Sequence, residues 1–423
     1  MSHPFRPAAA LLTVALATVP AGQAVAQETA VAVDVSAGGS YSTNPFLISG
    51  DSDGKGAFAT ELSVTPQVMY RDERSDAALI ARYRRSDYID RYNSAEGYGF
   101  TAQAQRALNP LLSANATVSF DSSIVGQSGL GVVGVVDPSL TPVPGIGLPV
   151  PGIGVPGVGV PGVSVPDLSL IGLNQRQNTL AASLGATLRV GPHDTLNGSV
   201  NANRVSYGSN SNIALLSSRG TGATIGYSRA LSERTSVGIQ GSGSWTEYDR
   251  NGFHGSSYSP QGTLSHRLGA QLNLDLAAGV VFISSTTTRG RSNVTGFSGS
   301  LSGCHTGNRS AQCLRAYSDA QATALGDISR RYGGSFDYSY RLRENDVLRA
   351  SIGYSRLVAT SDNTLQIPQV SYLNADAAYE RSFTRRFFGG ASVGYRQATG
   401  GGLGNPSDLI FRLFVRTRLG DRR

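Results

Sequence analysis

Arginines at alternating positions are the residues of this 423-residue sequence with the clearest capacity for binding chemistry. They occur where apolar residues alternate with small or polar ones, on the side opposite the apolar set. The set comprises Arg82, Arg84, Arg189, Arg412, Arg416 and Arg418. A guanidinium is always charged and offers several N–H donors, so such a cluster favours anions or sugar hydroxyls. Glu61, Asp275 and Asp337 fall on the same side, and structural Arg–carboxylate pairs are the competing interpretation.

Catalytic and metal-binding signals are weak. The pattern G-x-S-x-G occurs at Gly50–Gly54 and at Gly390–Gly394, but neither copy lies between a strand and a helix, where a nucleophile would need it. The histidines at 193, 254, 266 and 305 fall in or beside turns and loops, without the spacing of metal ligands. The sequence predicts no catalytic residue, no metal and no cofactor.

The elements that carry these side chains repeat along the chain, as residues 221–248 show. Ala223, Ile225 and Tyr227 alternate with Gly222, Thr224 and Gly226, and a polar turn leads to a second run of the same kind. Strands of ten or more residues with one apolar face are typical of a tilted bilayer crossing. The sequence therefore predicts an all-β, transmembrane, antiparallel up-and-down β-barrel.

Counting such runs predicts about sixteen strands, with 14–18 possible. The connections alternate between short charged turns and longer loops, which is typical of periplasmic turns and external loops respectively. Aromatic residues are expected to form a girdle at each end of the barrel. Tyr70, Tyr227, Tyr340 and Tyr379 would form the periplasmic girdle, and Tyr41, Phe120, Tyr207, Trp245 and Phe282 the external one.

The N-terminal residues 1–26 have the features of a cleaved secretory signal peptide. Arg6 supplies positive charge, residues 8–19 form a short apolar run, and Ala24-Val25-Ala26 gives a small-x-small cleavage pattern. The mature barrel would then span residues 27–423. The net charge of the full chain, +7, is spread along the sequence and does not indicate nucleic-acid binding.

Cys304 and Cys313 lie close together in an exported protein, which favours a disulfide. We expect them in an external loop at about residues 284–325.

The whole pattern resembles porin-like outer-membrane barrels of Gram-negative bacteria. In addition, residues 34–46, which read DVSAGGSYSTNPF, resemble the start of barrels that accompany exopolysaccharide secretion. These resemblances imply outer-membrane lipid and the barrel-assembly machinery as partners, with polysaccharide or export components as further candidates.

A Pro-Gly repeat distinguishes the external loop at about residues 122–177. Its dipeptides are Pro144-Gly145, Pro151-Gly152, Pro156-Gly157 and Pro161-Gly162. Each favours a type II turn, so the segment is expected to be a string of turns. A flexible external loop, an inward constriction that gates the pore, and a docking loop for a partner all remain open.

The predicted function is a water-accessible pore for small polar solutes or saccharides, because barrels of this size usually enclose a channel. Two alternatives remain. One is a non-conducting barrel that supports exopolysaccharide export or envelope structure. The other is an outer-membrane hydrolase with an outward Ser–His pair.

Overall fold

The computed structural model describes residues 28–49, 56–127, 167–208, 215–249, 253–287, 290–358, 369–400 and 404–420. The signal peptide and the Pro-Gly dipeptides predicted from the sequence lie outside the described residues. The strands of the first half are β1 (Glu28–Ser42), β2 (Ala57–Arg71), β3 (Ser75–Tyr88), β4 (Ala95–Ala107), β5 (Leu112–Ile124), β6 (Arg176–Arg189), β7 (Asp194–Tyr207), β8 (Ser218–Ser232) and β9 (Thr235–Tyr248).

The second half continues in the same manner. It contains β10 (His254–Leu268), β11 (Leu272–Thr287), β12 (Gly290–Thr306), β13 (Ser310–Ala322), β14 (Ile328–Arg343), β15 (Asp346–Val358), β16 (Val370–Ser382), β17 (Phe387–Gly400) and β18 (Ser407–Gly420). A short 3-10 helix, η2 (Leu168–Leu170), precedes β6. Within the described ranges, no helix has the length and hydropathy needed to cross a bilayer.

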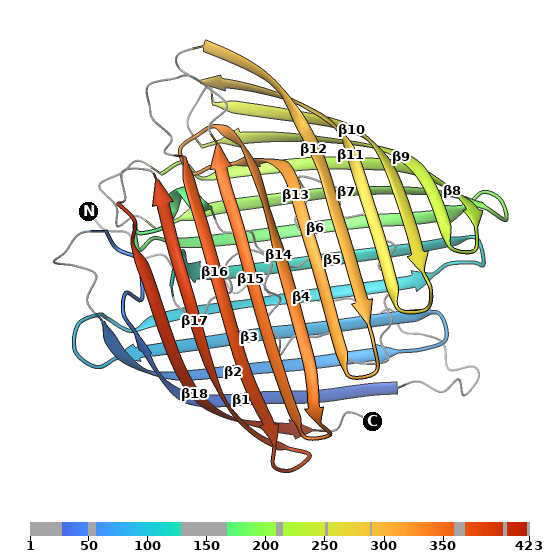
Figure 1. Cartoon of the computed structure of the whole chain (residues 1–423). Coiled ribbons are helices and arrows are strands. Elements are labelled where there is room, and N and C mark those ends of the chain that lie inside the picture. Colours follow the sequence, from blue (N-terminus) through green and yellow to red (C-terminus); the bar gives the residue numbers. More distant parts are fainter. Residues whose placement is uncertain are drawn as a thin grey trace, which may run out of the picture.

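The eighteen strands form one closed antiparallel barrel. Each strand pairs with its neighbours in the sequence, and β1 closes the barrel by pairing with β18 from Ala32–Gly420 to Ser42–Ile410 (Figure 1). Connections of two to four residues join the strands at one end, which we call the short-turn end. Most connections at the opposite, long-loop end are longer. The predicted fold class is confirmed, with eighteen strands where the count of alternating runs favoured sixteen.

The outer face of the barrel is apolar because the strand period of two places the aliphatic and aromatic residues on one side. On β8, for example, Ile225 is 63% exposed, while Thr224 on the other face is buried. Exposed aromatics occur on this face near both ends, among them Trp245 at the long-loop end and Tyr227 at the short-turn end. Tyr227 and Tyr379 donate hydrogen bonds to Asp194 and Asp346 of the preceding short-turn hairpins. The aromatic residues therefore reach the polar rim of the outer face.

The two strands beyond the expected sixteen are β12 and β13, in the region that the sequence predicted as an external loop at residues 284–325. That prediction was wrong, because Gly290–Thr306 and Ser310–Ala322 form a hairpin with a turn at the short-turn end. Polar and small residues fill both faces of β13 more evenly than in other strands, which weakens the alternation. Cys304 and Cys313 are directly opposite each other in this hairpin and form a disulfide.

Removing the disulfide is expected to weaken the hairpin without preventing barrel formation. The bond spans nine residues, so the chain-entropy model assigns it about 2–3 kcal/mol. Cys304→Ser should therefore still insert and show a heat-dependent gel shift, with a lower urea midpoint for unfolding. Cys304→Ser/Cys313→Ser is the matched control for effects of an unpaired thiol. Free-thiol labelling of both cysteines in the unreduced wild-type protein would contradict the bond.

The seam between β12 and β13 is shorter than either strand. Residues 299–306 of β12 pair with residues 311–318 of β13, whereas residues 290–298 pair with β11 alone among the described strands. Beyond this seam, the tip of the β13–β14 hairpin leans inward under the β10–β12 wall (Figure 1). There Ile328 packs against Val281 and Ile283, and its side chain occupies the space that a Cβ on Gly255 would need. This hairpin tip consequently enters the barrel interior.

Candidate functional site

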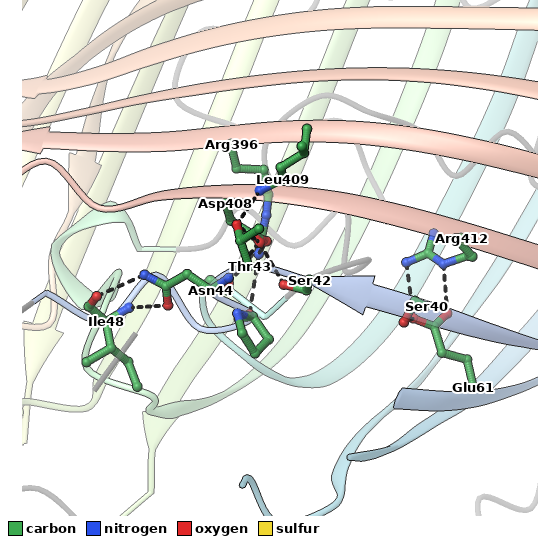
Figure 2. A network of polar contacts seen from close by, with 12 residues as sticks. Ser40, Ser42, Thr43, Asn44, Ile48, Glu61, Arg396, Asp408, Leu409 and Arg412 are labelled. Atoms are coloured by element: carbon green, nitrogen blue, oxygen red, sulfur yellow. Dashed lines mark hydrogen bonds and ion pairs between the residues drawn. The ribbon is translucent and has the colours of Figure 1, made fainter. Parts of the chain in front are cut away.

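The interior of the barrel has one charged wall, formed by strands from β13 through β18 to β5. Its central ion pairs join three strands. The carboxylate of Glu61 on β2 pairs with the guanidinium groups of Arg84 on β3 and Arg412 on β18, each with an N–O distance of 2.8 Å (Figure 2 shows the Arg412 contact). Arg418 likewise pairs with Asp34 at 2.7 Å. Further pairs on this wall are Arg82–Asp121, Arg349–Glu380, Arg416–Glu380, Arg315–Asp337 and Arg331–Asp319. Each of these arginines therefore has a carboxylate partner, and Glu61 and Glu380 are each shared by two arginines.

The opposite wall, from β6 to β12, is lined mainly by amides and hydroxyls. Gln240 of β9 donates to Gln261 of β10 at 2.6 Å, and Gln261 donates to Ser298 of β12 at 2.7 Å. Ser244 and Ser257 are hydrogen bonded at 2.7 Å. These contacts link neighbouring strands in a neutral polar surface, which can both donate and accept hydrogen bonds.

Asparagines on this neutral wall lie over glycines of the adjacent strand. A Cβ on Gly222 would be 2.7 Å from Asn201 Oδ1, and one on Gly220 would clash with Asn203 Oδ1. Asn197 has the same relation to Gly226. Because glycine has no side chain, each amide can lie flat against the wall. The interior of the barrel is therefore not narrowed where these amide groups are concentrated.

Three segments fold inward at the long-loop end. They are the β1–β2 connection around Asn44–Leu47, the described ends of the β5–β6 loop at residues 125–127 and 167–173, and the β13–β14 tip at residues 323–327. Together with the inner wall they form a buried apolar cluster, hereafter the mouth cluster. Its members are Leu47, Val125, Leu168, Leu170, Ile171, Ala324, Leu357, Val370, Tyr372 and Ala398.

The mouth cluster is held at one side by Arg396 of β17, which lies beside Asp408 of β18 (Figure 2). The side chain of Arg396 is 5% exposed and that of Asp408 is fully buried. The guanidinium donates to Gly126 O at 2.7 Å and to Pro45 O at 3.3 Å. Asp408 accepts from Ser42 Oγ and from the backbone N–H of Asn44. One ion pair therefore fastens two of the inward segments to the wall.

Asp167 fastens the third segment. Its carboxylate accepts hydrogen bonds from Ser169 and from the backbone N–H of Ala324 at the β13–β14 tip, and the Tyr207 hydroxyl lies 3.5 Å away. Burial raises the pKa of Asp167, because the hydrogen bonds only partly offset the loss of solvation. The η2 segment meanwhile contacts β16 on the far side of the barrel. The base of the long loop consequently crosses the interior.

The arginines predicted from the sequence all lie on the inward-facing side of their strands. Arg82, Arg84, Arg412, Arg416 and Arg418 join the charged wall, whereas Arg189 stands apart at the short-turn end of β6. Of the predicted carboxylates, Glu61 and Asp337 are paired with arginine. Tyr207, expected in the external aromatic girdle, instead points inward to Asp167.

Sequence reasoning missed Arg396, Asp408 and Asp167. The alternation of β17 and β18 could have indicated that Arg396 and Asp408 face inward, but their contacts depend on loops with no periodic signal. Within the described residues, no three His, Cys, Asp or Glu side chains gather as a metal site would require.

Replacing Glu61 by glutamine should make the interior more attractive to anions. The change leaves Arg84 and Arg412 without their shared carboxylate. A unit charge about 6 Å from an ion in water contributes about 0.7 kcal/mol, or about threefold in permeability. Reversal potentials across planar bilayers in a salt gradient measure the ratio. Asp194→Asn, outside the lumen, is the control; equal ratios for wild type and Glu61→Gln would contradict the expectation.

A closed barrel with an apolar outer face and a polar interior belongs to the class of outer-membrane β-barrels. No family model matches the chain, and no curated protein matches it.

Similar solved structures come from Pseudomonas aeruginosa and Neisseria meningitidis. Pseudomonas aeruginosa OccK2 (OpdF) in complex with glucuronate is 11% identical over 93% of this chain and 98% of that chain, with a TM-score of 0.45. OpdK with vanillate, from the same organism, is 10% identical over 92% and 99% of the two chains, with a TM-score of 0.43. The FrpB iron transporter from Neisseria meningitidis is 9% identical over 88% and 62%, also with a TM-score of 0.43. At these values the similarity carries no inference about the solute.

Proposed function

We propose that this barrel is an outer-membrane pore for small polar solutes and that uncharged, hydroxylated molecules such as saccharides are its preferred class. The observation that carries the proposal is the division of the interior into a charged wall, where each of the arginines named above has a carboxylate partner, and a wall of amides and hydroxyls. Paired arginines exert a weaker net field on a passing ion than free ones. The neutral wall offers donors and acceptors that match sugar hydroxyls.

Swelling of liposomes that contain the purified barrel tests this proposal. Glucose and gluconate have similar sizes but differ in charge, and glucose is expected to enter faster. Asn201→Ala/Asn203→Ala removes two lumenal amides without touching the ion pairs, so it should slow glucose more than chloride. Equal entry of both solutes would count against selection for neutral molecules. No swelling with any solute, together with no conductance, would refute the pore.

The competing candidate is a non-conducting barrel, and the mouth cluster is the observation that favours it. Ten buried residues pack across the long-loop end, with side chains contributed by loops as well as by the wall. A pore then requires either a passage beside the cluster or its displacement. We favour a pore because polar groups line the interior below the cluster, where a structural barrel would need no neutral polar wall. Nothing in the similar structures supports a role in polysaccharide export.

A signal peptide at residues 1–26, export through the Sec pathway and insertion by the barrel-assembly machinery are part of the same proposal. Two observations would support it. The N-terminus of the unprocessed precursor would be protected from protease, and the mature chain would start at Gln27.

A further inference from the structure

Two arginines oppose each other directly on the outer face of the barrel. Arg204 of β7 and Arg219 of β8 are cross-strand partners near the long-loop end. Both are exposed and lie on the same face as the exposed Val200 and Ile225. Directly opposed residues in an antiparallel pair have Cα atoms about 4.5–5.5 Å apart. Their charges are therefore close neighbours on the lipid-facing side.

This opposition departs from the rest of the barrel. In the ladders of the described strands, Arg204–Arg219 is the one directly opposed pair of like charges, because other arginines facing a charged residue face a carboxylate. The outward examples are Arg85–Glu96, Arg229–Asp194 and Arg381–Asp346. Like charges directly opposite each other destabilise a sheet.

The described residues supply too little negative charge to offset the repulsion. Glu247 is directly opposite Arg219 on the other side, with the nearest atoms 4.0 Å apart. The same carboxylate also accepts a hydrogen bond from Trp245 Nε1 at 3.3 Å. No carboxylate among the described residues lies within 4.0 Å of the Arg204 guanidinium. An external anion bound between the two guanidinium groups would relieve the repulsion.

The position of the pair indicates what kind of anion this is. Trp245 is 45% exposed on the same face, and tryptophan on the outside of a barrel marks the level of the lipid headgroups. Towards the middle of the barrel, the same face continues with Ala202, Val200, Ala223 and Ile225. Two cations above an apolar strip match a molecule with an anionic head and acyl chains, whereas a free anion would use only the cations.

We propose that Arg204 and Arg219 form a binding site for the phosphate of an anionic lipid in the leaflet at the long-loop end. Guanidinium groups hold phosphate oxygens by paired, charge-assisted hydrogen bonds. Trp245 lies beside the headgroup, and the apolar strip contacts the acyl chains. The site does not depend on whether the barrel conducts.

Lipid retention by the purified barrel tests the site. Native mass spectrometry would compare wild type with Arg204→Gln/Arg219→Gln, using diphosphorylated lipid A as the probe and phosphatidylcholine as the uncharged reference. The double variant is expected to bind lipid A about tenfold more weakly or worse, since two charge-assisted contacts are lost. Arg229→Gln is the matched control, because Arg229 is an outward arginine at the other end of β8 and faces Asp194. Its lipid A binding should equal that of the wild type.

A second measurement separates binding from a general effect on folding. In detergent without anionic lipid, Arg204→Gln should melt at a higher temperature than wild type, because the repulsion is removed. With lipid A present, the order should reverse. Unchanged lipid A retention in the double variant, or equal loss in Arg229→Gln, would overturn the proposal. Displacement of lipid A by equimolar inorganic phosphate would show a free-anion site and would also overturn the lipid assignment.

Discussion

Arg396→Gln is expected to release the inward segments and to increase single-channel conductance at the long-loop end. The substitution removes the donors to Gly126 O and Pro45 O and leaves Asp408 buried without its cation. Breaking one partner of a buried pair usually costs about 3–5 kcal/mol, which is large compared with the stability of a docked loop. Planar-bilayer recordings should show larger and more variable current steps than in the wild type.

Two further variants make this expectation specific. Arg396→Gln/Asp408→Asn removes both charges, so it should recover barrel stability in urea while still leaving the segments released. Arg381→Gln, an outward arginine at the short-turn end, should leave conductance unchanged. If Arg396→Gln conducts as the wild type does, with equal noise, the ion pair does not control access to the interior.

Acidification is expected to close the barrel through Asp167. Burial raises the pKa of this carboxyl above its ordinary value near 4, whereas in the undocked segment the carboxyl is in water and titrates normally. Docking is therefore fully favoured below the ordinary pKa and weakens as the pH rises through the raised one. Each unit of difference changes the docking equilibrium tenfold, or about 1.4 kcal/mol.

Conductance measured from pH 4 to pH 8 should accordingly rise with pH in the wild type. Asp167→Asn cannot titrate and should abolish that rise. Asp327→Asn, at the β13–β14 tip, controls for another carboxyl in the same region. A wild-type conductance that is constant over this range, or a pH dependence that survives in Asp167→Asn, would be incompatible with the mechanism.

The barrel and the facing of its inner arginines follow from local alternation, so the sequence predicts them well. On β18 every second residue from Leu409 to Leu419 is apolar or threonine, and the inward face follows directly. Alternation fails at β12 and β13, where Ser, Gly and Gln occupy both faces and the turn resembles a loop. The disulfide was predicted from the proximity of its cysteines, but their place in a hairpin required the ladder.

The contacts at the mouth could not be predicted from local patterns. Arg396 meets Gly126 and Pro45, which are hundreds of residues distant in the sequence. Tyr207 has the expected position near the end of a strand, yet parity with Asn203 turns it inward to Asp167. An aromatic residue at a strand end therefore indicates a girdle only when it shares the apolar face.

The short seam between β12 and β13 is the place in the barrel wall where two neighbouring strands can separate most easily. Elsewhere, long ladders on both sides of a strand must break together, whereas residues 290–298 have no ladder partner on β13. A side-chain contact, from Ser318 Oγ to Phe297 O at 3.0 Å, lies at the end of the paired region. Separation of β12 from β13 would begin at this unpaired edge and proceed along the ladder towards the short-turn end. The Cys304–Cys313 bond lies near the short-turn end of this ladder and holds the two strands together there. A reducing compartment would break this bond, so the redox state of the surroundings determines how far the β12–β13 seam can separate.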